Sequence, residues 1–253
     1  MIITITNQKG GIGKTTTAHN LGYGLAQRGF KVLLVDLDGQ KNLTMATRSN
    51  QAFKNSYDLM TKRATAKECI HPLNDNIDII NGSLDLATLD IELNDIGKEY
   101  RLKEMLEPVK NNYDFIIIDT PPTLNIITVN ALTCADRVLI PCEADIFSLD
   151  AVSTLHNKTI EVVKKYTNSN LKTDGILLTK YNDRTILARE ITEKYKELAD
   201  SIGTKLYNAK IRRANAIDES HTRRQDIFTY ARKSKVANDY NEFIDEFLKG
   251  VSK

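Results

Sequence analysis

Short apolar runs alternate with longer amphipathic stretches along this chain. The apolar runs that predict strands cover residues 2–6, 32–36, 77–81, 115–119, 138–141, 175–179 and 205–207. Helical spacing of apolar positions predicts helices over residues 15–28, 84–96, 148–166 and 186–201. The central runs are almost entirely apolar, as in parallel strands that are covered on both faces. This alternation predicts an α/β fold, with a doubly wound, mostly parallel sheet and helices on both faces.

A glycine-rich segment joins the first predicted strand to the first predicted helix. Residues 8–17 read Gln-Lys-Gly-Gly-Ile-Gly-Lys-Thr-Thr-Thr. Glycines let backbone N–H groups approach a phosphate without a Cβ in the way, and the helix N-terminus adds its positive dipole end. Lys14 can reach the outer phosphates, and the Thr15 hydroxyl can ligate Mg²⁺. The segment therefore predicts a phosphate-binding loop, and a glycine-rich turn with exposed lysines is the alternative.

Lys9 distinguishes this loop from the usual P-loop pattern. That pattern has a glycine five residues before Gly13, and this chain has Gln8 there. A cation at position 9 reaches a phosphate of its own loop only with difficulty, whereas it can point outward to a nucleotide on a second copy. The sequence therefore predicts that Lys9 acts across a dimer.

Carboxylates follow two of the predicted buried strands. Asp36 and Asp38 follow one apolar run, and Asp119 ends another, just before Pro121 and Pro122. In a doubly wound sheet, ligands bind beyond the carboxyl ends of the strands, so we expect these carboxylates near the phosphates. There, a carboxylate can hold Mg²⁺ through water or activate water. We expect Asp38 to be the catalytic carboxylate and Asp36 only to cap or orient the loop. For Asp119, the alternative is a structural role in a simple strand-end turn.

Three segments resemble the motifs of the ParA/Soj/MinD ATPases, which carry a deviant Walker A phosphate loop: residues 9–16, 36–40 and 118–122. Residues 178–185 and the segment after Ile211 are also similar, so the resemblance covers nearly the whole chain. It implies a P-loop NTPase fold with ATP and Mg²⁺ as cofactors. It also implies a homodimer that encloses ATP between its subunits, with a lysine of each loop reaching the partner's nucleotide.

The same resemblance implies a role for each residue of the site. Phosphate binding is expected at Gly10, Gly11, Ile12, Gly13, Lys14, Thr15 and Thr16. The catalytic residues would be Lys9, Lys14 and Asp38, of which Asp38 positions the attacking water. Mg²⁺ would be held by Thr15 and, through water, by Asp119.

Two positions depart from the family's pattern. Arg213 matches the arginine of its Ile-Pro-Arg-Asn segment and is expected to take part in nucleotide binding, but Arg212 replaces the proline. Gly39 stands where the family usually has proline. This change is expected to loosen the loop after Asp38 and to affect water positioning more than ATP binding.

Composition describes an ordinary globular protein of 253 residues, 41% hydrophobic and 27% charged. We expect one domain over residues 1–253, without an N-terminal helix-turn-helix extension, because the phosphate loop begins so early. The balance of 35 basic and 33 acidic residues leaves a net charge of +2, so a nucleic-acid partner would need local clustering of charge. Three cysteines fit a reducing cytosol, and we find no signal peptide or membrane-spanning stretch.

Basic residues gather between positions 210 and 235. The candidates for DNA contact are Arg212, Arg223, Arg224, Arg232, Lys233 and Lys235. The acidic residues of that span are Asp218, Glu219 and Asp226. Ala216 stands where some family members carry a DNA-binding arginine. The cluster predicts non-specific DNA binding, and a solvated basic face is the alternative.

The last predicted helix, over residues 238–249, argues against a membrane anchor. Its apolar positions at helical spacing are Tyr240, Phe243, Ile244, Phe247 and Leu248. Its other face carries Asp239, Glu242, Asp245 and Glu246, which anionic lipid would repel. We therefore expect a packed helix and no membrane partner. Cys134 and Cys142, in and after a strand pattern, lack the spacing of a cluster site and are expected to be buried.

Together these features predict a ParA-type ATPase for plasmid or chromosome partition, cytoplasmic and associated with the nucleoid. It would form an ATP-dependent sandwich dimer and bind non-specific DNA. A ParB-like centromere-binding protein would stimulate hydrolysis. The alternatives are a MinD-like membrane-directed regulator, another cargo-positioning ATPase, or a P-loop kinase or synthetase that acts on a small molecule.

Overall fold

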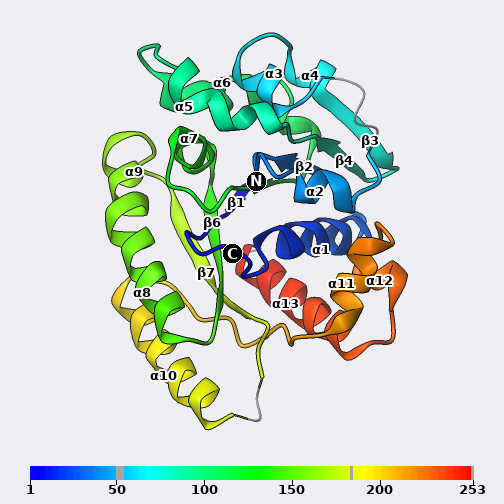
Figure 1. The fold of residues 1–253 in the computed structure, drawn as a ribbon, viewed down its shortest axis with the longest axis vertical. Coiled ribbons are helices and arrows are strands. Elements are labelled where there is room, and N and C mark those ends of the chain that lie inside the picture. The colour runs from blue at the N-terminus through cyan, green and yellow to red at the C-terminus, as the bar shows by residue number, and fades with distance from the viewer. Residues whose placement is uncertain (50–53, 183–184, 252–253) are drawn as a thin grey trace.

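The computed structural model describes residues 1–49, 54–182 and 185–251 (Figure 1). A seven-stranded sheet in the order β3-β4-β2-β5-β1-β6-β7 forms its centre. The strands are β1 (Ile2–Ile5), β2 (Val32–Asp36), β3 (Ile70–Asn74), β4 (Ile77–Ile80), β5 (Phe115–Asp119), β6 (Arg137–Glu143) and β7 (Lys172–Thr179). Every neighbouring pair is parallel except β3 with β4, so the predicted mostly parallel sheet is confirmed.

Helices cover both faces of the sheet. The longer ones are α1 (Lys14–Ala26), α7 (Ile126–Cys134), α8 (Ile146–Leu155), α10 (Ile186–Ser201), α11 (Asn215–Thr222) and α13 (Lys235–Val251). The shorter ones are α2 (Asn42–Ala46), α3 (Ser56–Met60), α4 (Ala66–Cys69), η1 (Leu84–Thr88), α5 (Leu89–Glu92), η2 (Lys98–Tyr100), α6 (Arg101–Leu106), η3 (Lys110–Asn112), η4 (His156–Ile160), α9 (Glu161–Tyr166) and α12 (Ile227–Tyr230). One face packs against α1, α12 and α13, and the other against α7, α8 and α10.

The central strands are apolar throughout because both of their faces are buried. Successive side chains of a strand point to opposite faces. In β5, Ile117 packs on the α1 side, whereas Ile116 and Ile118 pack on the α7 side. This is the physical reason for the continuous apolar run in the sequence.

The strand register brings the site together. β5 lies between β1 and β2, and Asp119 is level with both Ile5 and Asp36. The strands are parallel, so their carboxyl ends meet at one edge of the sheet. The phosphate loop leaves β1 at this same edge, next to both carboxylates.

Several predicted elements differ from the structure. β3 was not predicted, because it is a partly exposed edge strand that contains Pro72 and lacks an apolar run. Residues 205–207 contribute only one bridge, between Leu206 and Ile176. The helix expected over 84–96 is η1 followed by α5, which ends at Glu92, and a π-helical turn, η4, interrupts the helix expected over 148–166.

The C-terminal helix packs as predicted, with one correction. Tyr240, Phe243 and Phe247 of α13 are buried against α1 and the sheet. Asp239, expected on the exposed acidic face, is instead buried beside Arg212. Cys134 is buried as predicted but ends α7 rather than lying in a strand. Within the described ranges, no helix has both the length and the apolar character that crossing a membrane requires.

Candidate ATP site

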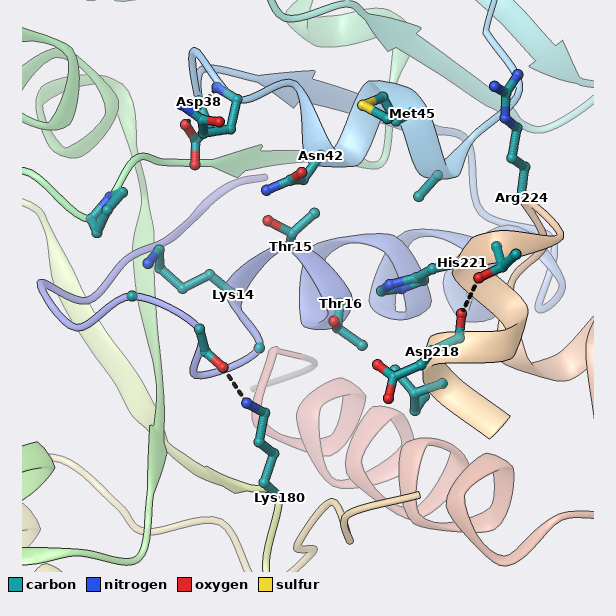
Figure 2. A pocket seen from close by; sticks show the side chains of 18 residues that line it. Lys14, Thr15, Thr16, Asp38, Asn42, Met45, Lys180, Asp218, His221 and Arg224 are labelled. Atoms are coloured by element: carbon teal, nitrogen blue, oxygen red, sulfur yellow. Dashed lines mark hydrogen bonds between the residues drawn. The ribbon is translucent and has the colours of Figure 1, made fainter. Parts of the chain in front are cut away.

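The phosphate loop adopts the open conformation that its glycines allow. Gly11 and Gly13 have φ angles of +74° and +88°, which residues with a Cβ rarely adopt. The end of β7 holds the loop from behind, because the Thr179 hydroxyl lies 2.6 Å from the Ile12 carbonyl oxygen and Lys180 Nζ donates to the Gly11 carbonyl (Figure 2). The loop leads directly into α1, whose first-turn N–H groups have no partner within the helix and therefore suit an anion in the cleft that this loop lines.

Lys14 is the buried cation of this site. Its side chain is nearly buried, and Nζ donates to the Lys9 carbonyl oxygen at 3.2 Å. Burial lowers the pKa of Lys14, and the nearby carboxylates of Asp119 and Asp38 partly oppose that shift. A buried ammonium gains from an anion placed against it, so the site favours phosphate.

Asp119 is the buried anion. It is fully buried, and neither carboxylate oxygen makes a hydrogen bond of normal geometry with the residues that the structure describes. Burial raises the pKa of Asp119 well above its ordinary value and Asp36 adds to the effect, whereas the Thr15 hydroxyl and Lys14 lower it. A buried carboxylate beside a hydroxyl is a donor set that suits a hard cation such as Mg²⁺.

Asp36 holds the loop that carries Asp38. Its carboxylate accepts hydrogen bonds from the Asp38 N–H at 3.1 Å and from the N–H and hydroxyl of Thr44 at 2.9 and 2.7 Å. Burial raises the pKa of Asp36 to about 6. Asp38 itself accepts from the Gln40 N–H at 2.9 Å and lines the cleft. Asp36 therefore fixes the start of the loop and Asp38 lines the cleft, whereas their expected roles in catalysis and orientation stay predictions.

A cleft of about 700 Å³ extends from the phosphate loop along α1 (Figure 2). One wall is α2, with Met45 exposed to the cleft, and the other is α11, with Asp218 and His221. Arg224 lies at the far end. The sequence placed Arg224 in a DNA-binding cluster, and the structure adds that it lines the same cleft as the phosphate loop.

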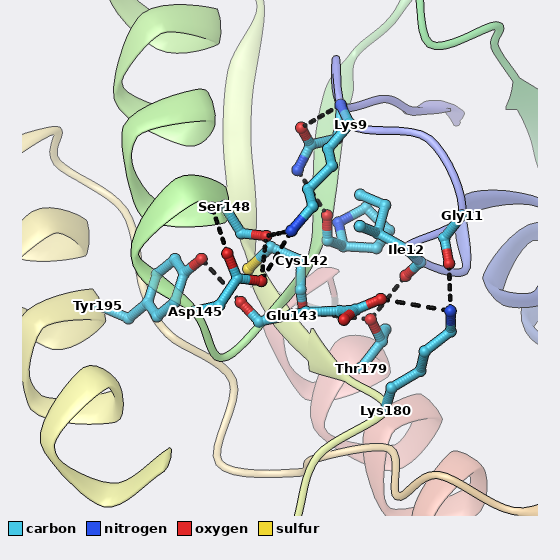
Figure 3. Close-up of polar contacts among 12 residues, drawn as sticks. Lys9, Gly11, Ile12, Cys142, Glu143, Asp145, Ser148, Thr179, Lys180 and Tyr195 are labelled. Carbon is cyan, nitrogen blue, oxygen red and sulfur yellow. Dashed lines mark hydrogen bonds and ion pairs between the residues drawn. The ribbon is translucent and has the colours of Figure 1, made fainter. Parts of the chain in front are cut away.

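Lys9 is held within its own chain (Figure 3). Its Nζ lies 2.9 Å from Asp145 Oδ2 and 3.0 Å from Ser148 Oγ. Asp145 also caps α8 by accepting from the Ser148 N–H at 2.9 Å. Burial tends to raise the pKa of Asp145, but hydrogen bonds from Lys9 and Ser148 outweigh this, and the net shift is downward. Sequence reasoning missed both partners, although Asp-x-x-Ser after a strand is a recognisable capping pattern.

Known proteins resemble this chain in sequence and in fold. A family model described as an AAA domain matches residues 1–173. The sporulation initiation inhibitor protein Soj of Bacillus subtilis is 40% identical over 249 residues, which cover 97% of each chain. This chain belongs to the ParA/Soj family of chromosome-partitioning ATPases. The chromosome partitioning protein ParA of Myxococcus xanthus is 34% identical, with 98% of this chain and 88% of that one covered.

A solved structure matches this member of the ParA/Soj family over its whole length. It is a cobyrinic acid a,c-diamide synthase of Mycobacterium smegmatis with bound ADP and magnesium. Its TM-score is 0.85 at 29% identity, and the match covers 100% of this chain and 95% of that one. The P-loop NTPase fold predicted from the motifs is thereby confirmed.

The segment after Ile211 carries two candidate site residues, Arg212 and Arg213, which differ in their contacts. Arg212 forms a bidentate pair with the buried Asp239, with both N···O distances 2.6 Å. Arg213 is exposed, and its N–H bonds the Tyr181 carbonyl at 3.4 Å. Neither arginine is among the described residues that line the cleft. The predicted roles of Arg212 in DNA binding and of Arg213 in nucleotide binding stay predictions.

The other basic candidates are exposed. They are Arg223, Arg224, Arg232, Lys233 and Lys235. Across residues 1–49, 54–182 and 185–251, no carboxylate forms an ion pair with any of them. Arg223 and Arg224 follow α11, Arg232 and Lys233 lie between α12 and α13, and Lys235 begins α13, so the chain brings them to one side of the molecule (Figure 1). Asp183 and Arg184, in the segment that resembles the family, lie outside the described residues.

Proposed function

We propose that this protein is a ParA-type partition ATPase that binds ATP with Mg²⁺, dimerises around the nucleotide and then binds DNA without sequence preference. The observation that carries this proposal is the fully buried Asp119 carboxylate, without a hydrogen-bond partner among the described residues, at the foot of a glycine loop that also presents Lys14 and Thr15. Such a charge is costly unless a cation joins it. A nucleotide with its metal ion would bring a cation to Asp119 and phosphate anions to Lys14.

Each residue of the loop has a task in this proposal. The N–H groups of residues 10–16 bind the phosphates, Lys14 neutralises the outer ones, and Thr15 with Asp119 holds Mg²⁺. The ion, when bound, stabilises negative charge on the phosphates. Asp38 positions the attacking water. Gly39 does not leave this loop unsupported, because the Asp38 carboxylate accepts from the Gln40 N–H and the Asp38 N–H donates to Asp36.

Dimerisation would change the partner of Lys9. In the single chain Lys9 contacts Asp145, and in the dimer we propose that it contacts the nucleotide of the second copy. Apolar side chains at the starts of α8 and α10 support a covering subunit at this edge. Phe147 is 80% exposed and Ile186 74% exposed, and these two helices pack against each other. Large apolar side chains, and aromatic ones above all, are enriched at protein interfaces, so these exposed residues support a covering subunit.

The exposed basic residues after α11 support the proposed DNA partner. Two copies in a dimer would double the number of phosphate contacts, which would make DNA binding depend on ATP. A ParB-like centromere-binding protein would stimulate hydrolysis, and the protein would associate with the nucleoid in the cytoplasm. We propose that residues 1–253 form one domain.

Two other functions are less well supported. A MinD-like regulator would need a membrane-binding surface, but the apolar face of α13 is buried in the core. A small-molecule synthase is the function in the name of the solved Mycobacterium smegmatis protein. Lys9 and the higher identity to Soj argue against a synthase function for this chain. Co-sedimentation with DNA or with anionic liposomes, each with ATP, separates partition from membrane targeting.

The proposed function can be tested with two variants. Lys14→Ala removes the buried cation, so ATP binding in a direct titration should be lost, whereas Lys67→Ala on α4 should bind as the parent does. Asp38→Ala should still bind ATP and should accumulate as a dimer on size-exclusion chromatography, because it cannot position water. Parent-like ATP affinity in Lys14→Ala would refute the phosphate-site assignment. A monomeric Asp38→Ala that still releases phosphate would refute the role of Asp38.

A further inference from the structure

Two arginines with left-handed backbone conformations lie near each other, and one of them, Arg224, lines the far end of the cleft. Arg48 has φ +58° and Arg224 has φ +52°, values that non-glycine residues seldom adopt. The Arg48 guanidinium donates to the Arg223 carbonyl at 2.8 Å, a contact between segments 175 residues apart. Arg48, Arg223 and Arg224 therefore form a cluster drawn from two distant parts of the chain, called here the arginine surface.

The positive charge of the arginine surface is not neutralised within the described chain. All three side chains are exposed, and no carboxylate among the described residues forms an ion pair with them. Of the three acids nearest in sequence to Arg223 and Arg224, two are otherwise engaged, and the third, Asp218, is exposed on α11 and forms no ion pair with either arginine in the described residues. Asp226 is buried and caps α12 through the N–H groups of Phe228 and Thr229, both at 3.0 Å, and Glu219 accepts from the Tyr230 hydroxyl at 2.8 Å. Adjacent exposed guanidinium groups suit a ligand that carries several phosphates.

The arginine surface is also connected to the nucleotide site. Arg48 follows α2, which begins just after the Asp38 loop and is fastened by Thr44 to the buried Asp36. Met45 of α2 and Arg224 both line the cleft that begins at the phosphate loop. A shift of the Asp38 loop would therefore move Arg48 relative to Arg223 and Arg224.

We propose that Arg48 joins Arg223 and Arg224 in binding the phosphate backbone of nucleic acid, and that α2 makes its contribution depend on the nucleotide within a single subunit. This inference rests on the proposed DNA binding and adds two things to it. It names a contact residue outside the 210–235 cluster, and it gives a second route to ATP dependence besides dimerisation.

The test is DNA binding by Arg48→Ala across a salt series. Fluorescence anisotropy measures the affinity for an arbitrary duplex, with a non-hydrolysable ATP analogue and Mg²⁺ present. Loss of one phosphate contact per subunit should reduce the magnitude of the log K–log[salt] slope by about 0.9 per subunit and weaken binding several-fold. Arg48→Lys, which keeps the charge, should retain most of the slope. Lys67→Ala is the matched control for a lost exposed cation and should bind as the parent does.

The outcomes separate this inference from the proposed function. If the parent protein does not bind DNA with the analogue, DNA binding itself fails. If the parent binds and Arg48→Ala has the parent's slope, the inference is overturned. It is also overturned if Arg48→Ala weakens analogue binding as much as DNA binding, since Arg48 would then serve the nucleotide. If Arg48→Ala weakens DNA binding by the same factor with and without the analogue, the connection through α2 is refuted.

Discussion

Buried charges define the site at the scale of single residues. Lys14, Asp36 and Asp119 lie within one small region, and burial shifts the pKa of each toward its uncharged form. Asp36 offsets its burial with hydrogen bonds of normal geometry inside the chain, whereas Asp119 has only the Thr15 hydroxyl and the Lys14 ammonium nearby to oppose its burial. The two carboxylates therefore differ in their surroundings: Asp36 is tied into the chain, whereas Asp119 is the one that we propose to hold Mg²⁺.

His19 gives the protein a pH-dependent stability. Its ring on α1 is fully buried, with neither nitrogen bonded to a described residue, and burial followed by the nearby His221 lowers the pKa of His19 to about 3. The unfolded chain takes up a proton near pH 6.5 and the folded chain does not, so stability falls as the pH drops below 6.5. Each pH unit below that value costs about 1.4 kcal/mol.

We expect His19→Leu to lose less stability than the parent on acidification. Urea unfolding at pH 7 and pH 5 should show about 2 kcal/mol less pH-dependent loss in the variant. A change of His71→Leu on the edge strand β3 is the control. Identical pH dependence of parent and His19→Leu would contradict this account.

We expect Asp145 to compete with the proposed dimer for Lys9, because the two side chains are paired within the single chain. Asp145→Asn keeps the helix cap, because asparagine caps as well as aspartate, but weakens the pair with Lys9. The pair is partly exposed, so its loss is worth about 0.2–1 kcal/mol. Both subunits of the dimer give up this pair, so the effect is doubled. The variant should therefore dimerise with an ATP analogue at a protein concentration up to about 30-fold lower than the parent, measured by analytical ultracentrifugation. A variant that needs more protein than the parent would count against competition for Lys9.

At the scale of elements, the turn after β4 supports the loop after β2. The Gly82 N–H donates to the Thr44 hydroxyl at 2.8 Å, and Thr44 in turn donates to Asp36. A Cβ at Gly82 would lie 2.8 Å from the carboxyl carbon of Asp36. The space for the buried carboxylate therefore depends on a glycine in a neighbouring element.

Gly82→Ala should displace Asp36 and, with it, the Asp38 loop. We expect a loss of about 1–3 kcal/mol in unfolding free energy. ATP hydrolysis should fall more than ATP affinity, because Asp38 acts on the water. Gly175→Ala is the matched control, since a Cβ there is comparably crowded, 2.6 Å from a ring carbon of Tyr207, but lies on β7 rather than beside the Asp38 loop. Equal hydrolysis rates in the two variants would show that the Asp38 loop does not depend on Asp36.

At the scale of the whole molecule, the charge is nearly balanced but unevenly distributed. The net charge is +2, yet exposed basic residues collect after α11 and before α13. Arg224 lines the nucleotide cleft, whereas Arg232 and Lys233 are not among the described residues that line it. Arg232 and Lys233 therefore allow DNA binding to be tested apart from nucleotide binding.

We expect Arg232→Glu with Lys233→Glu to weaken DNA binding equally for unrelated duplexes and to leave basal ATP hydrolysis intact. The reason is that phosphate contacts carry no sequence information. Affinity for three unrelated duplexes and phosphate release, measured on the same preparation, check this. Lys67→Glu is the control for charge reversal elsewhere. Unchanged DNA affinity in the double variant would indicate that these two residues belong to a solvated basic face and do not contact DNA.

The sequence by itself determined the features that are local or repeated. Continuous apolar runs predicted the buried parallel strands, and the phosphate loop lies in one unbroken segment after β1. Asp119 could be placed beside that loop because parallel strands end at a common edge. The edge strand β3, with exposed residues and Pro72, had no such pattern and was missed.

Only the tertiary structure decided which distant residues meet. Lys9 and Asp145 are 136 positions apart, and Arg48 and Arg223 are 175 apart. The pairing of Arg212 with Asp239 likewise depends on how α13 packs against α1. Local patterns encode strands, helices and loops through the periodicity of burial. The contacts between their ends arise from the order of strands in the sheet and the packing of helices on it, which no short segment specifies.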